Sequence, residues 1–551
     1  MKTKDSLKRL IVFLLLLCGW GSCKKAPIIS DTSDQVNIIG YLEKNKAQFS
    51  DLLKILSTTG DNGFLSVYGA YTFFAPTNDA ISAYLKATGR PSIDKIDLQE
   101  LKDLMKFHLL EDTLTTPSFS DGKLPRLTMY GQYLITGASN TGGQTRITVN
   151  RQANLIQSNI RVSNGVIHVI DHVLVPATQT LAQTITSDPK YSVFAEALQA
   201  TGLYDTVNIL PGNNPDSTKQ WLTVIAESDS VLAAAGFSSY AALKARYCHT
   251  GDPKNVTDSL YLYVRYHILY GIKYLADIVS NTSHTTLAPL EVVTSKLSGL
   301  TVLINDDVFN GVHEPGVELD RNTSDRSASN GVVHSALGHF AIKVRNPVPV
   351  YWDVADFPEI RNLPAYYGKQ NYPFALTNMP KDITVPGPSA MTYTVGGTYV
   401  KGDFLAIPLG GPGRSPWVEL KTPLLVRGRY KVWICYRTQK QSGSSNNVNQ
   451  ISIDGEPLQR SMNFTVNMPI STEGEMESQG WKWYTSPASN NWAGRLVGTI
   501  EIRTTDRHLL RFTTLQGTQN NNNLDMIHFI PQDMDQLYPR FMADGTPVPR
   551  P

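Results

Sequence analysis

The clearest signal in the chain is a helical spacing of apolar residues that occurs twice. The first copy consists of Leu101, Leu104, Met105 and His108, and the second of Leu260, Tyr263, Val264 and His267. Residues at i, i+3, i+4 and i+7 lie on one helix face, so each copy predicts a helix with a buried face that carries a histidine. A lone histidine there is more often a hydrogen-bonded core residue than a ligand.

Each copy also contains an apolar run that changes abruptly into a polar helix start. These runs are Thr72–Asp79 and Leu222–Asp229. Both predict a strand followed by a helix, with Asn78 and Ser228 as equivalent N-cap residues that accept backbone N–H bonds. In this alignment Glu227 of the second copy takes the place of Thr77 in the first.

A third match is an Asn-Gly dipeptide that opens a strand. Asn164–Leu174 and Asn330–Phe340 both begin Asn-Gly-Val and then carry His168 or His334. The three matches recur in the same order, at separations of 150, 159 and 166 residues. Small loop insertions account for the growing offset, so the sequence predicts two related α+β domains.

From Tyr351 onwards the helical spacing disappears, and short alternating strands take its place. In Arg429–Arg437 alternate residues are predicted to face opposite ways, with Tyr430, Val432, Ile434 and Tyr436 on one side and Lys431, Trp433 and Cys435 on the other. Further strands are predicted at Gln450–Gly455 and Leu524–Ile530, and a hairpin from Thr499–Arg503 and His508–Phe512. Short strands with frequent turns predict an all-β sandwich or jelly roll. Before it, Asp353, Asp356 and Glu359 are interpreted as a solvated linker.

The first 23 residues have the pattern of an export signal. Four basic residues precede the apolar run Leu10–Leu17, which is too short to span a membrane. Gly21-Ser22-Cys23 resembles a lipoprotein box, with Trp20 in place of the usual Leu, and predicts lipidation of Cys23; the alternative is an ordinary cleaved signal. The remaining Cys248 and Cys435 lie in different predicted domains and are not expected to form a disulfide.

Composition narrows the classes of function. The formal net charge is only +2, whereas a nucleic-acid binder normally carries a basic bias. The chain contains no CxxC pair, HExxH motif, Walker A loop or GxSxG elbow. We therefore predict no nucleic-acid partner, no cofactor, no metal site and no catalytic residue.

The repeated features resemble the fasciclin domain. Thr72–Ala80 matches the family's first motif block, Phe107-His108 and Tyr266-His267 match its Tyr-His region, and the Asn-Gly-Val-x-His strands match its second block. The resemblance covers about residues 36–176 and 186–346, with 177–190 as the link, and is stronger in the first copy. It implies α+β domains that act in extracellular adhesion, with motif residues that are mainly structural: Thr77, Asn78, Asp79, His108, His168, His267 and His334.

The C-terminal part, predicted as a domain over 349–551, resembles the galactose-binding-like jelly roll of carbohydrate-binding modules. The matching features, over about residues 385–531, are Gly428-Arg-Tyr430, Asp454-Gly455, Gly498–Leu510 and Asn523–Ile527. This resemblance implies a glycan or protein ligand. The N-terminal acidic pattern that holds structural calcium in many such modules is not evident in the sequence.

Aromatic and amide residues of the C-terminal part supply a candidate glycan site. Sugar rings stack their C–H faces on aromatic rings, and sugar hydroxyls need hydrogen-bonding groups such as amides. The candidates are Trp481, Trp483, Tyr484, Asn491, Trp492 and Asn523. The alternative is that the tryptophans fill the core; the two interpretations are balanced for Trp492, and a core position is favoured for Trp433.

These features lead to three functional hypotheses. The first is a non-catalytic, lipid-anchored protein of the cell envelope, at the outer membrane, that recognises an extracellular glycan or surface protein. The second is an accessory glycan-capture lipoprotein of a polysaccharide-uptake system. The third, a glycan-active enzyme, requires two facing carboxylates, which sequence alone does not pair.

Overall fold

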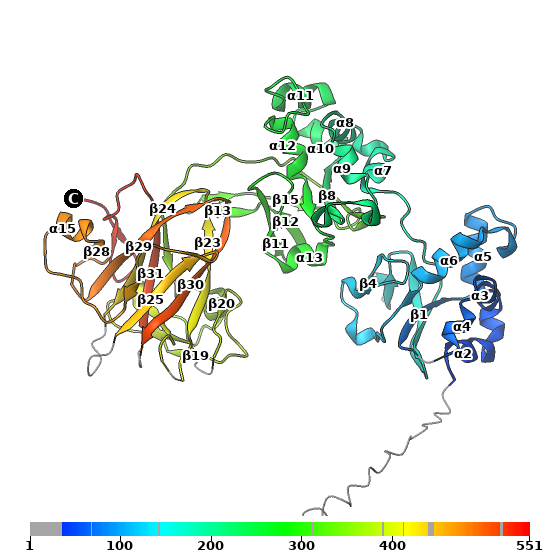
Figure 1. The fold of residues 1–551 in the computed structure, drawn as a ribbon, viewed down its shortest axis with the longest axis horizontal. Coiled ribbons are helices and arrows are strands. Elements are labelled where there is room, and N and C mark those ends of the chain that lie inside the picture. Colours follow the sequence, from blue (N-terminus) through cyan, green and yellow to red (C-terminus); the bar gives the residue numbers. More distant parts are fainter. Residues whose placement is uncertain are drawn as a thin grey trace, which may run out of the picture. The chain divides into compact units, whose positions relative to one another are not determined.

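The computed structural model describes residues 36–67, 69–141, 144–309, 312–387, 391–411, 413–438, 446–517 and 522–551. The chain divides into two compact units between Pro176 and Ala177. The first unit holds one mixed α+β domain, and the second holds another, followed by an antiparallel β-sandwich (Figure 1). The predicted fold class is confirmed. The predicted leader and Cys23 lie outside the described residues.

The first α+β domain is built on a seven-stranded sheet with the order β2-β1-β7-β6-β5-β4-β3. Its strands are β1 (Tyr71–Pro76), β2 (Leu109–Leu110), β3 (Gly122–Leu127), β4 (Tyr133–Thr141), β5 (Gln144–Val149), β6 (Ala153–Val162) and β7 (Gly165–Ile170). Its helices are α2 (Ile38–Lys44), α3 (Lys46–Thr59), α4 (Asn62–Leu65), α5 (Asn78–Ala87) and α6 (Leu98–Phe107). Hydrophobic clusters cover both faces of β1 and β7, which leaves these two strands almost completely buried.

The second α+β domain repeats this plan. Its sheet has the order β10-β11-β12-β15-β17-β8-β9, with β16 paired to β17. The strands are β8 (Leu222–Glu227), β9 (Ile268–Tyr270), β10 (Ser283–Thr285), β11 (Val292–Ser298), β12 (Thr301–Ile304), β15 (Val317–Leu319), β16 (Arg326–Ala328) and β17 (Gly331–Ala336), beside a separate hairpin of β13 (Asp307–Phe309) and β14 (Val312–Glu314). The helices are α7 (Leu181–Thr186), α8 (Ser192–Ala200), α9 (Leu203–Val207), α10 (Asp229–Ala234), α11 (Tyr240–Tyr247), α12 (Ser259–Tyr266) and α13 (Leu275–Ser280).

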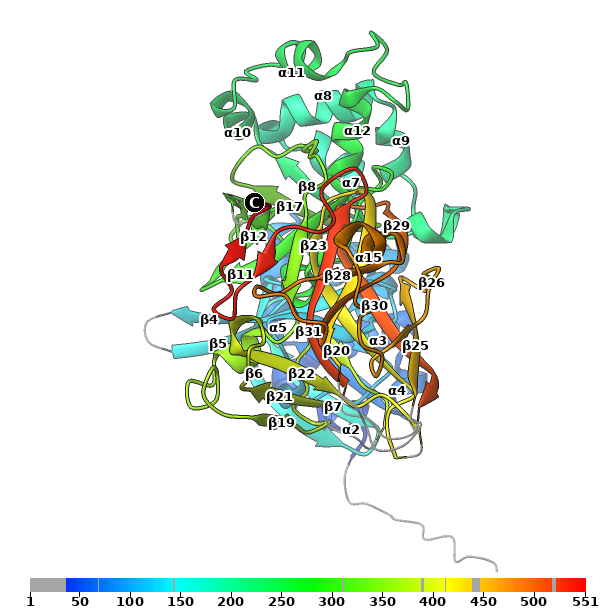
Figure 2. The same ribbon diagram turned by 90° about the vertical axis from the view of Figure 1, so that its left-hand side faces the viewer.

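Helices α7 to α12 gather on one side of the second sheet (Figures 1 and 2). Helix α7 lies within the segment 177–190 that the sequence suggested as a link. Its Leu181 and Ile185 are fully buried in the core of the second domain. The structure therefore places this helix inside the second unit.

The parallel pair at the centre of each sheet fixes how the two domains correspond. Tyr71 of β1 lies opposite Gly165, and Leu222 of β8 lies opposite Gly331. A Cβ atom on either glycine would approach the facing strand's carbonyl oxygen to about 2 Å, which is why both positions are glycine. This register makes Thr77 equivalent to Ser228, and Pro76 equivalent to Glu227. The alignment proposed from the sequence was wrong by one residue in this segment, because the apolar runs alone do not fix register.

The C-terminal sandwich has two sheets, with the orders β19-β21-β22-β31-β24-β29-β28 and β20-β23-β30-β25-β26. The first sheet contains β18 (Val350–Asp353, paired to β31), β19 (Tyr372–Phe374), β21 (Met391–Val395), β22 (Asp403–Ile407), β24 (Gly428–Arg437), β28 (Trp481–Trp483), β29 (Trp492–Ile502) and β31 (Asn522–Pro531). The second contains β20 (Ile383–Thr384), β23 (Trp417–Leu425), β25 (Asn447–Ile453), β26 (Glu456–Pro457), β27 (Met462–Asn463, paired to β25) and β30 (Asp506–Gly517). Helices α14 (Pro358–Arg361) and α15 (Glu473–Ser478) and the pair β32 (Arg540–Phe541) and β33 (Pro547–Val548) complete it.

The alternation predicted for β24 is confirmed. Tyr430, Val432, Ile434 and Tyr436 pack in the core between the sheets. Trp433 and Cys435 face the opposite side, in a second cluster that includes Tyr484, Trp492 and Phe541. The first sheet is thus buried on both faces, and Trp433 is a core residue as favoured.

Two other predictions were wrong. The hairpin predicted from Thr499–Arg503 and His508–Phe512 does not form, because β29 pairs with β24 and β28 while β30 pairs with β23 and β25 in the other sheet. The supposed linker around Asp353 is strand β18, paired to β31, and Asp353 is only 7% exposed. The first error arises because local sequence shows a strand but does not show its partner. The second arises because the alternation of apolar residues around Trp352 was not interpreted as a strand.

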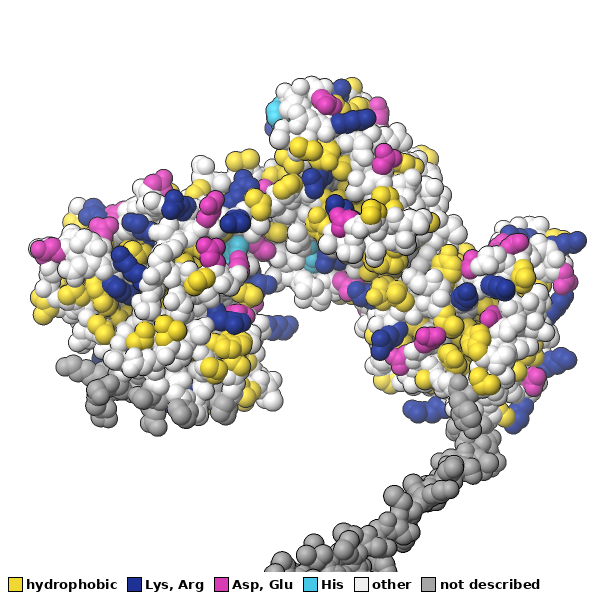
Figure 3. Space-filling model, in the orientation of Figure 1, with side chains coloured by type: hydrophobic (Ala, Val, Ile, Leu, Met, Phe, Trp, Pro, Cys, Tyr) yellow, Lys and Arg dark blue, Asp and Glu magenta, His cyan; other side chains and the backbone are white. Residues whose placement is uncertain are grey.

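Cys248 and Cys435 are both free, as expected. Within the described ranges, no helix combines the length and apolar character needed to cross a bilayer. Figure 3 shows acidic and basic side chains interspersed among uncharged ones on the visible face, in keeping with the near-balanced charge.

Candidate functional site

The predicted core histidine of the first domain is buried and fully hydrogen-bonded. His108 follows α6, and its Nδ1 lies 2.7 Å from the carbonyl oxygen of Leu104. Its Nε2 accepts a 2.9 Å hydrogen bond from the backbone N–H of Leu174. The ring must therefore be neutral, with its proton on Nδ1. Burial lowers the pKa of His108 to about 4, in keeping with that state.

The equivalent His267 has a different partner. Its Nδ1 lies 2.8 Å from the carbonyl oxygen of Tyr263, as in the first domain, but its Nε2 lies 3.0 Å from the carboxylate of Glu227. Both ring nitrogens of His267 therefore face oxygen atoms, whereas Nε2 of His108 faces an N–H group. The Phe340 N–H, equivalent to that of Leu174, donates to Glu227 at 2.8 Å. Glu227 is thus inserted between the histidine and the backbone group that contact each other directly in the first domain.

Glu227 accepts four hydrogen bonds in all. The other two come from the Tyr263 hydroxyl at 3.0 Å and from His339 Nδ1 at 2.8 Å. Burial alone would raise the pKa of Glu227, but the hydrogen bonds from His267 and His339 lower it to about 2. The sequence singled out Glu227 only as a departure from the motif, and His339 was not predicted at all.

The second pair of histidines and the helix starts hold the repeats together. His168 and His334 are fully buried, and each approaches a backbone carbonyl through Nε2, that of Leu114 at 3.0 Å and that of Lys273 at 2.7 Å. Thr77, and not Asn78, caps α5 by accepting from the Ala80 N–H.

Asn78 instead ties α5 to α3. Its side chain accepts from the Asp51 N–H at 3.0 Å and donates to the Ala47 carbonyl at 3.0 Å. Asp79 is exposed in the first turn of α5, where a negative charge favours the helix N-terminus. Each of these motif residues therefore has a structural contact or position.

The predicted glycan residues separate into two groups. Trp481, Trp483 and Asn491 keep exposed surface. The Arg495 guanidinium lies 4.5 Å from the Trp481 ring centre, and Trp483 Nε1 donates to Asn490 at 3.3 Å. Tyr484, Trp492 and Asn523 are buried, at 0%, 7% and 2% exposure. This second group offers almost no surface for a sugar to contact.

The buried group has internal partners. The Tyr484 hydroxyl donates to Asp525 at 2.8 Å, and the Asn523 amide donates to the Tyr399 hydroxyl at 2.6 Å. The Trp492 ring packs edge-on against Tyr399. Of the two balanced interpretations for Trp492, its surroundings match the core position.

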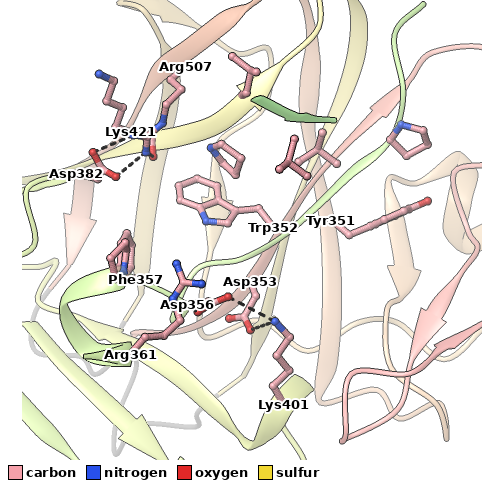
Figure 4. A pocket seen from close by; sticks show the side chains of 16 residues that line it. Tyr351, Trp352, Asp353, Asp356, Phe357, Arg361, Asp382, Lys401, Lys421 and Arg507 are labelled. Atoms are coloured by element: carbon pink, nitrogen blue, oxygen red, sulfur yellow. Dashed lines mark hydrogen bonds and ion pairs between the residues drawn. The ribbon is translucent and has the colours of Figure 1, made fainter. Parts of the chain in front are cut away.

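A pocket of about 580 Å³ opens at the edge of the sandwich. Its lining includes β18 and the segment leading into α14, together with residues near the bulge of β23 and its partner strand β30. Figure 4 shows the rings of Trp352 and Phe357 in its wall, with charged side chains around them. The charged lining residues are Asp353, Asp356, Arg361, Asp382, Lys401, Lys421 and Arg507.

Each charged group of this lining has a polar partner. Arg507 and Asp382 form a two-pronged pair at 3.2 and 2.6 Å. Arg361 Nε lies 3.1 Å from Asp356. The Lys401 ammonium lies 3.3 Å from Asp353 and 3.7 Å from Asp356, and Lys421 donates to the Thr282 hydroxyl at 2.9 Å. The pocket therefore presents aromatic surface beside fixed hydrogen-bonding groups.

Sequence reasoning missed this pocket because it took β18 for a linker. A usable signal was present, since Val348, Val350, Trp352 and Val354 alternate along the segment. What the sequence does not show is that Lys421 and Arg507 from other strands, and Asp382 from the turn before β20, come to the same place.

Buried carboxylates lie behind the pocket. Asp403 and Asp525 are 4% and 0% exposed, and their partners are the hydroxyls of Tyr393 at 2.7 Å and Tyr484 at 2.8 Å. Burial, followed by the charge of Asp353, raises the pKa of Asp403 to about 7.

A structural calcium ion, as held by many carbohydrate-binding modules, would take six to eight oxygen ligands. Among the described residues, no three His, Cys, Asp or Glu side chains are grouped so as to hold a metal ion. An ammonium, that of Lys401, faces Asp353 instead. The residues present do not fit the ion.

Comparison with known proteins finds a family model to which part of the chain is similar. Residues 47–176 match the fasciclin domain. The chain is 29% identical over 157 residues to protein sll1483 of Synechocystis sp., covering 28% of this chain and 81% of that protein. It is 26% identical over 207 residues to the transforming growth factor-beta-induced protein ig-h3 of Sus scrofa, covering 37% of this chain and 27% of the relative.

A longer match is to human periostin, 24% identical over 316 residues, which covers 56% of this chain and 31% of periostin. The chain thus spans most of the cyanobacterial protein but less than a third of these animal relatives.

Two solved structures have similar parts. One is a FAS1 domain pair from the insect cell adhesion molecule fasciclin I, with a TM-score of 0.24 and 17% identity, covering 53% of this chain and 97% of that chain. The other is a family 35 carbohydrate binding module from Clostridium thermocellum, with a TM-score of 0.18 and 13% identity, covering 33% of this chain and 98% of that chain.

Proposed function

We propose that this protein is a non-catalytic, extracytoplasmic binding protein whose C-terminal sandwich captures a glycan. In this proposal two fasciclin-type domains contact surface proteins and hold the sandwich away from a lipid anchor at Cys23. The observation that carries the proposal is the pocket at the sandwich edge, with aromatic surface and fixed charge pairs in one lining.

The chemistry of the pocket suits a sugar. Its volume falls within the usual range of small-ligand sites, roughly 300–1,000 Å³. The rings of Trp352 and Phe357 offer a surface to the C–H face of a sugar. The Arg507–Asp382 and Arg361–Asp356 pairs present donors and acceptors to its hydroxyls without leaving a lone buried charge.

Binding of the whole protein to a panel of oligosaccharides and polysaccharides tests this proposal. Replacing Arg361 or Arg507 with Ala is expected to weaken binding by roughly 10- to 100-fold, because hydrogen bonds to charged groups contribute about 1.5–3 kcal/mol. Trp481→Ala and Trp483→Ala are the matched controls, since both rings lie outside the pocket lining. Failure to bind any glycan, with a protein captured instead, would leave only the adhesive role.

The partly buried rings of Trp481 and Trp483, with the exposed Asn491, form the second candidate surface. The same experiment separates the two sites. Loss of binding in the tryptophan variants with unchanged binding in the arginine variants would move the proposed site to this surface.

The absence of turnover is also a proposal. Asp353 lines the pocket, and burial raises its pKa, as in a general acid. The Lys401 ammonium contacts both Asp353 and Asp356, which suits binding better than proton transfer. Hydrolysis of any panel glycan by the wild type that Asp353→Asn abolishes would show that the protein is an enzyme.

The lipid anchor is tested separately from the glycan. Metabolic labelling with an alkyne fatty acid is expected to label the wild type and Cys18→Ser, but not Cys23→Ser. Labelling that persists in Cys23→Ser would contradict the anchor. The role in polysaccharide uptake uses the same pocket, and genes for outer-membrane transporters and glycoside hydrolases beside this one would favour it.

A further inference from the structure

The pocket wall that contains Lys401 meets three strands that are far apart in the sequence. Asp353 ends β18, Asp403 begins β22, and Asp525 lies in the bulge of β31. The turn Val400–Gly402 connects them, because the Val400 N–H approaches Asp525 at 3.3 Å while the Lys401 ammonium lies 3.3 Å from Asp353. Three carboxylates are thus buried around one turn.

These carboxylates are incompletely satisfied. Among the described residues, one oxygen of each of Asp403 and Asp525 is buried without a hydrogen-bond partner, and the buried Oδ2 of Asp353 faces only the Lys401 ammonium. Buried charges normally have a counter-ion or a full set of hydrogen bonds. At Asp353, the carboxylate of this group that faces Lys401, the need is therefore for positive charge.

Lys401 supplies that charge from an unfavourable backbone conformation. Its φ of 59° is in the left-handed region, which non-glycine residues rarely adopt and which persists only where the surroundings impose it. Figure 4 shows its ammonium directed at Asp353 and Asp356. Burial alone would lower the pKa of Lys401, but the carboxylates of Asp353 and Asp356 raise it above its ordinary value.

We infer that the ammonium of Lys401 serves as the built-in cation of the sandwich, at a junction of β18, β22 and β31 where a divalent metal would otherwise be needed. The stability of the domain therefore does not depend on calcium. Removing the ammonium leaves carboxylates that a divalent cation stabilises. This inference does not depend on what the pocket binds.

Thermal unfolding of the whole protein, followed by tryptophan emission, tests the inference. Six of the eight tryptophans lie in the sandwich, so the emission reports mainly on that domain. The wild type is expected to unfold at the same temperature in millimolar CaCl2 and in EDTA. Lys401→Met is expected to unfold lower in EDTA by roughly 5 °C or more, because a buried carboxylate loses its partner. CaCl2 is expected to restore part of that loss.

The exposed Lys381→Met variant is the matched control and is expected to behave as the wild type. Destabilisation of the wild type by EDTA, an unchanged Lys401→Met, or a Lys401→Met that CaCl2 does not stabilise would each overturn the inference. If Lys401→Met does not fold, the double variant Lys401→Met/Asp353→Asn decides. Recovery of folding supports the charge pairing, and continued failure contradicts it.

Discussion

The two α+β domains bury the same histidine with different hydrogen-bond partners. In the first domain His108 accepts the Leu174 N–H and stays neutral. In the second, Glu227 lies between His267 and Phe340 and accepts from both. One difference in a strand, glutamate where the first domain has Pro76, thus places a buried carboxylate in the core of the second domain at a position that is apolar in the first. The comparison shows that a shared backbone register does not fix the electrostatics of the core.

The largest effect is expected from removing the carboxylate that distinguishes the domains. Glu227→Ala leaves His267, His339, Tyr263 and the Phe340 N–H without their acceptor, and is expected to destabilise the second domain by about 3–5 kcal/mol. Hydrogen–deuterium exchange of the β8 amides measures this loss. Glu196→Ala, an exposed position in α8, is the control. Unchanged protection of the β8 amides in Glu227→Ala would show that the hydrogen bonds to Glu227 contribute little to the stability of the second domain.

The two domains are also expected to respond differently to acid. In the unfolded chain His108 takes up a proton near its ordinary pKa of 6.5. In the folded protein, where burial lowers the pKa of His108 to about 4, it takes up that proton only near pH 4. The first domain is therefore expected to lose roughly 3 kcal/mol of its free energy of unfolding as the pH falls across this window. The measurement is β1 amide exchange from pH 7 to pH 4 in the wild type and in His108→Gln, which lacks this titration. An identical pH slope in both would contradict the assignment.

Glu227 gives the second domain a window of the same sign at lower pH. Its folded pKa of about 2 lies below the ordinary 4.5, so its contribution is fully present above pH 4.5 and is lost only as the pH falls towards 2. Burial also lowers the pKa of His284 in this domain to about 4. The free energy of unfolding of the second domain is therefore expected to fall between pH 6.5 and pH 4 as well. The pH dependence of β1 exchange in the wild type is therefore compared with His108→Gln, and that of β8 exchange with Glu227→Ala.

A third prediction concerns what the domains share. The Asn164 side chain accepts from the Ile38 N–H and donates to the carbonyls of Leu65 and Val67. Asn330 makes the same three bonds, with Leu181, Val207 and Ile209. Replacing either asparagine with Ala is expected to cost its own domain about 2–3 kcal/mol, measured by amide exchange in β1 or β8. A large cost in only one domain would disprove the structural equivalence.

The smallest effect is expected at the helix caps. Thr77→Ala and Ser228→Ala each remove the side chain that accepts the N-terminal N–H bond of α5 or α10. Each is expected to cost about 1 kcal/mol. Asn78→Ala is the informative comparison, because that residue was predicted as the cap. A loss of cap protection at the Ala80 amide in Asn78→Ala, but not in Thr77→Ala, would restore the original prediction.

Much of the fold follows from local pattern. The helix face of Leu101 and Leu104, the alternation of Tyr430 and Val432, and the strands after Asn164 and Asn330 all appear as predicted. Each depends on periodicity within one element, which burial of a single face imposes directly on the sequence.

The candidate site was predictable only in part. Trp481 and Trp483 are partly buried against the core between the sheets, whereas Tyr484 is fully buried in the cluster on the opposite face, with its hydroxyl on Asp525. Side chains in a short loop and strand differ in burial according to what covers them, and here β31 and the C-terminal segment supply that cover. The pocket residues Asp353 and Arg507 are 154 positions apart in the chain and share no local pattern.

The sequence by itself determined three things about this protein: the repeat, the class of each domain and the sites of its core histidines. These follow from periodicity and from glycine or asparagine at positions where the backbone permits little else. The tertiary structure alone decided which groups meet: Glu227 with His267, Lys401 with Asp353, and β30 with β23 instead of β29. Such pairings depend on distance in space, and a linear pattern carries no record of that distance.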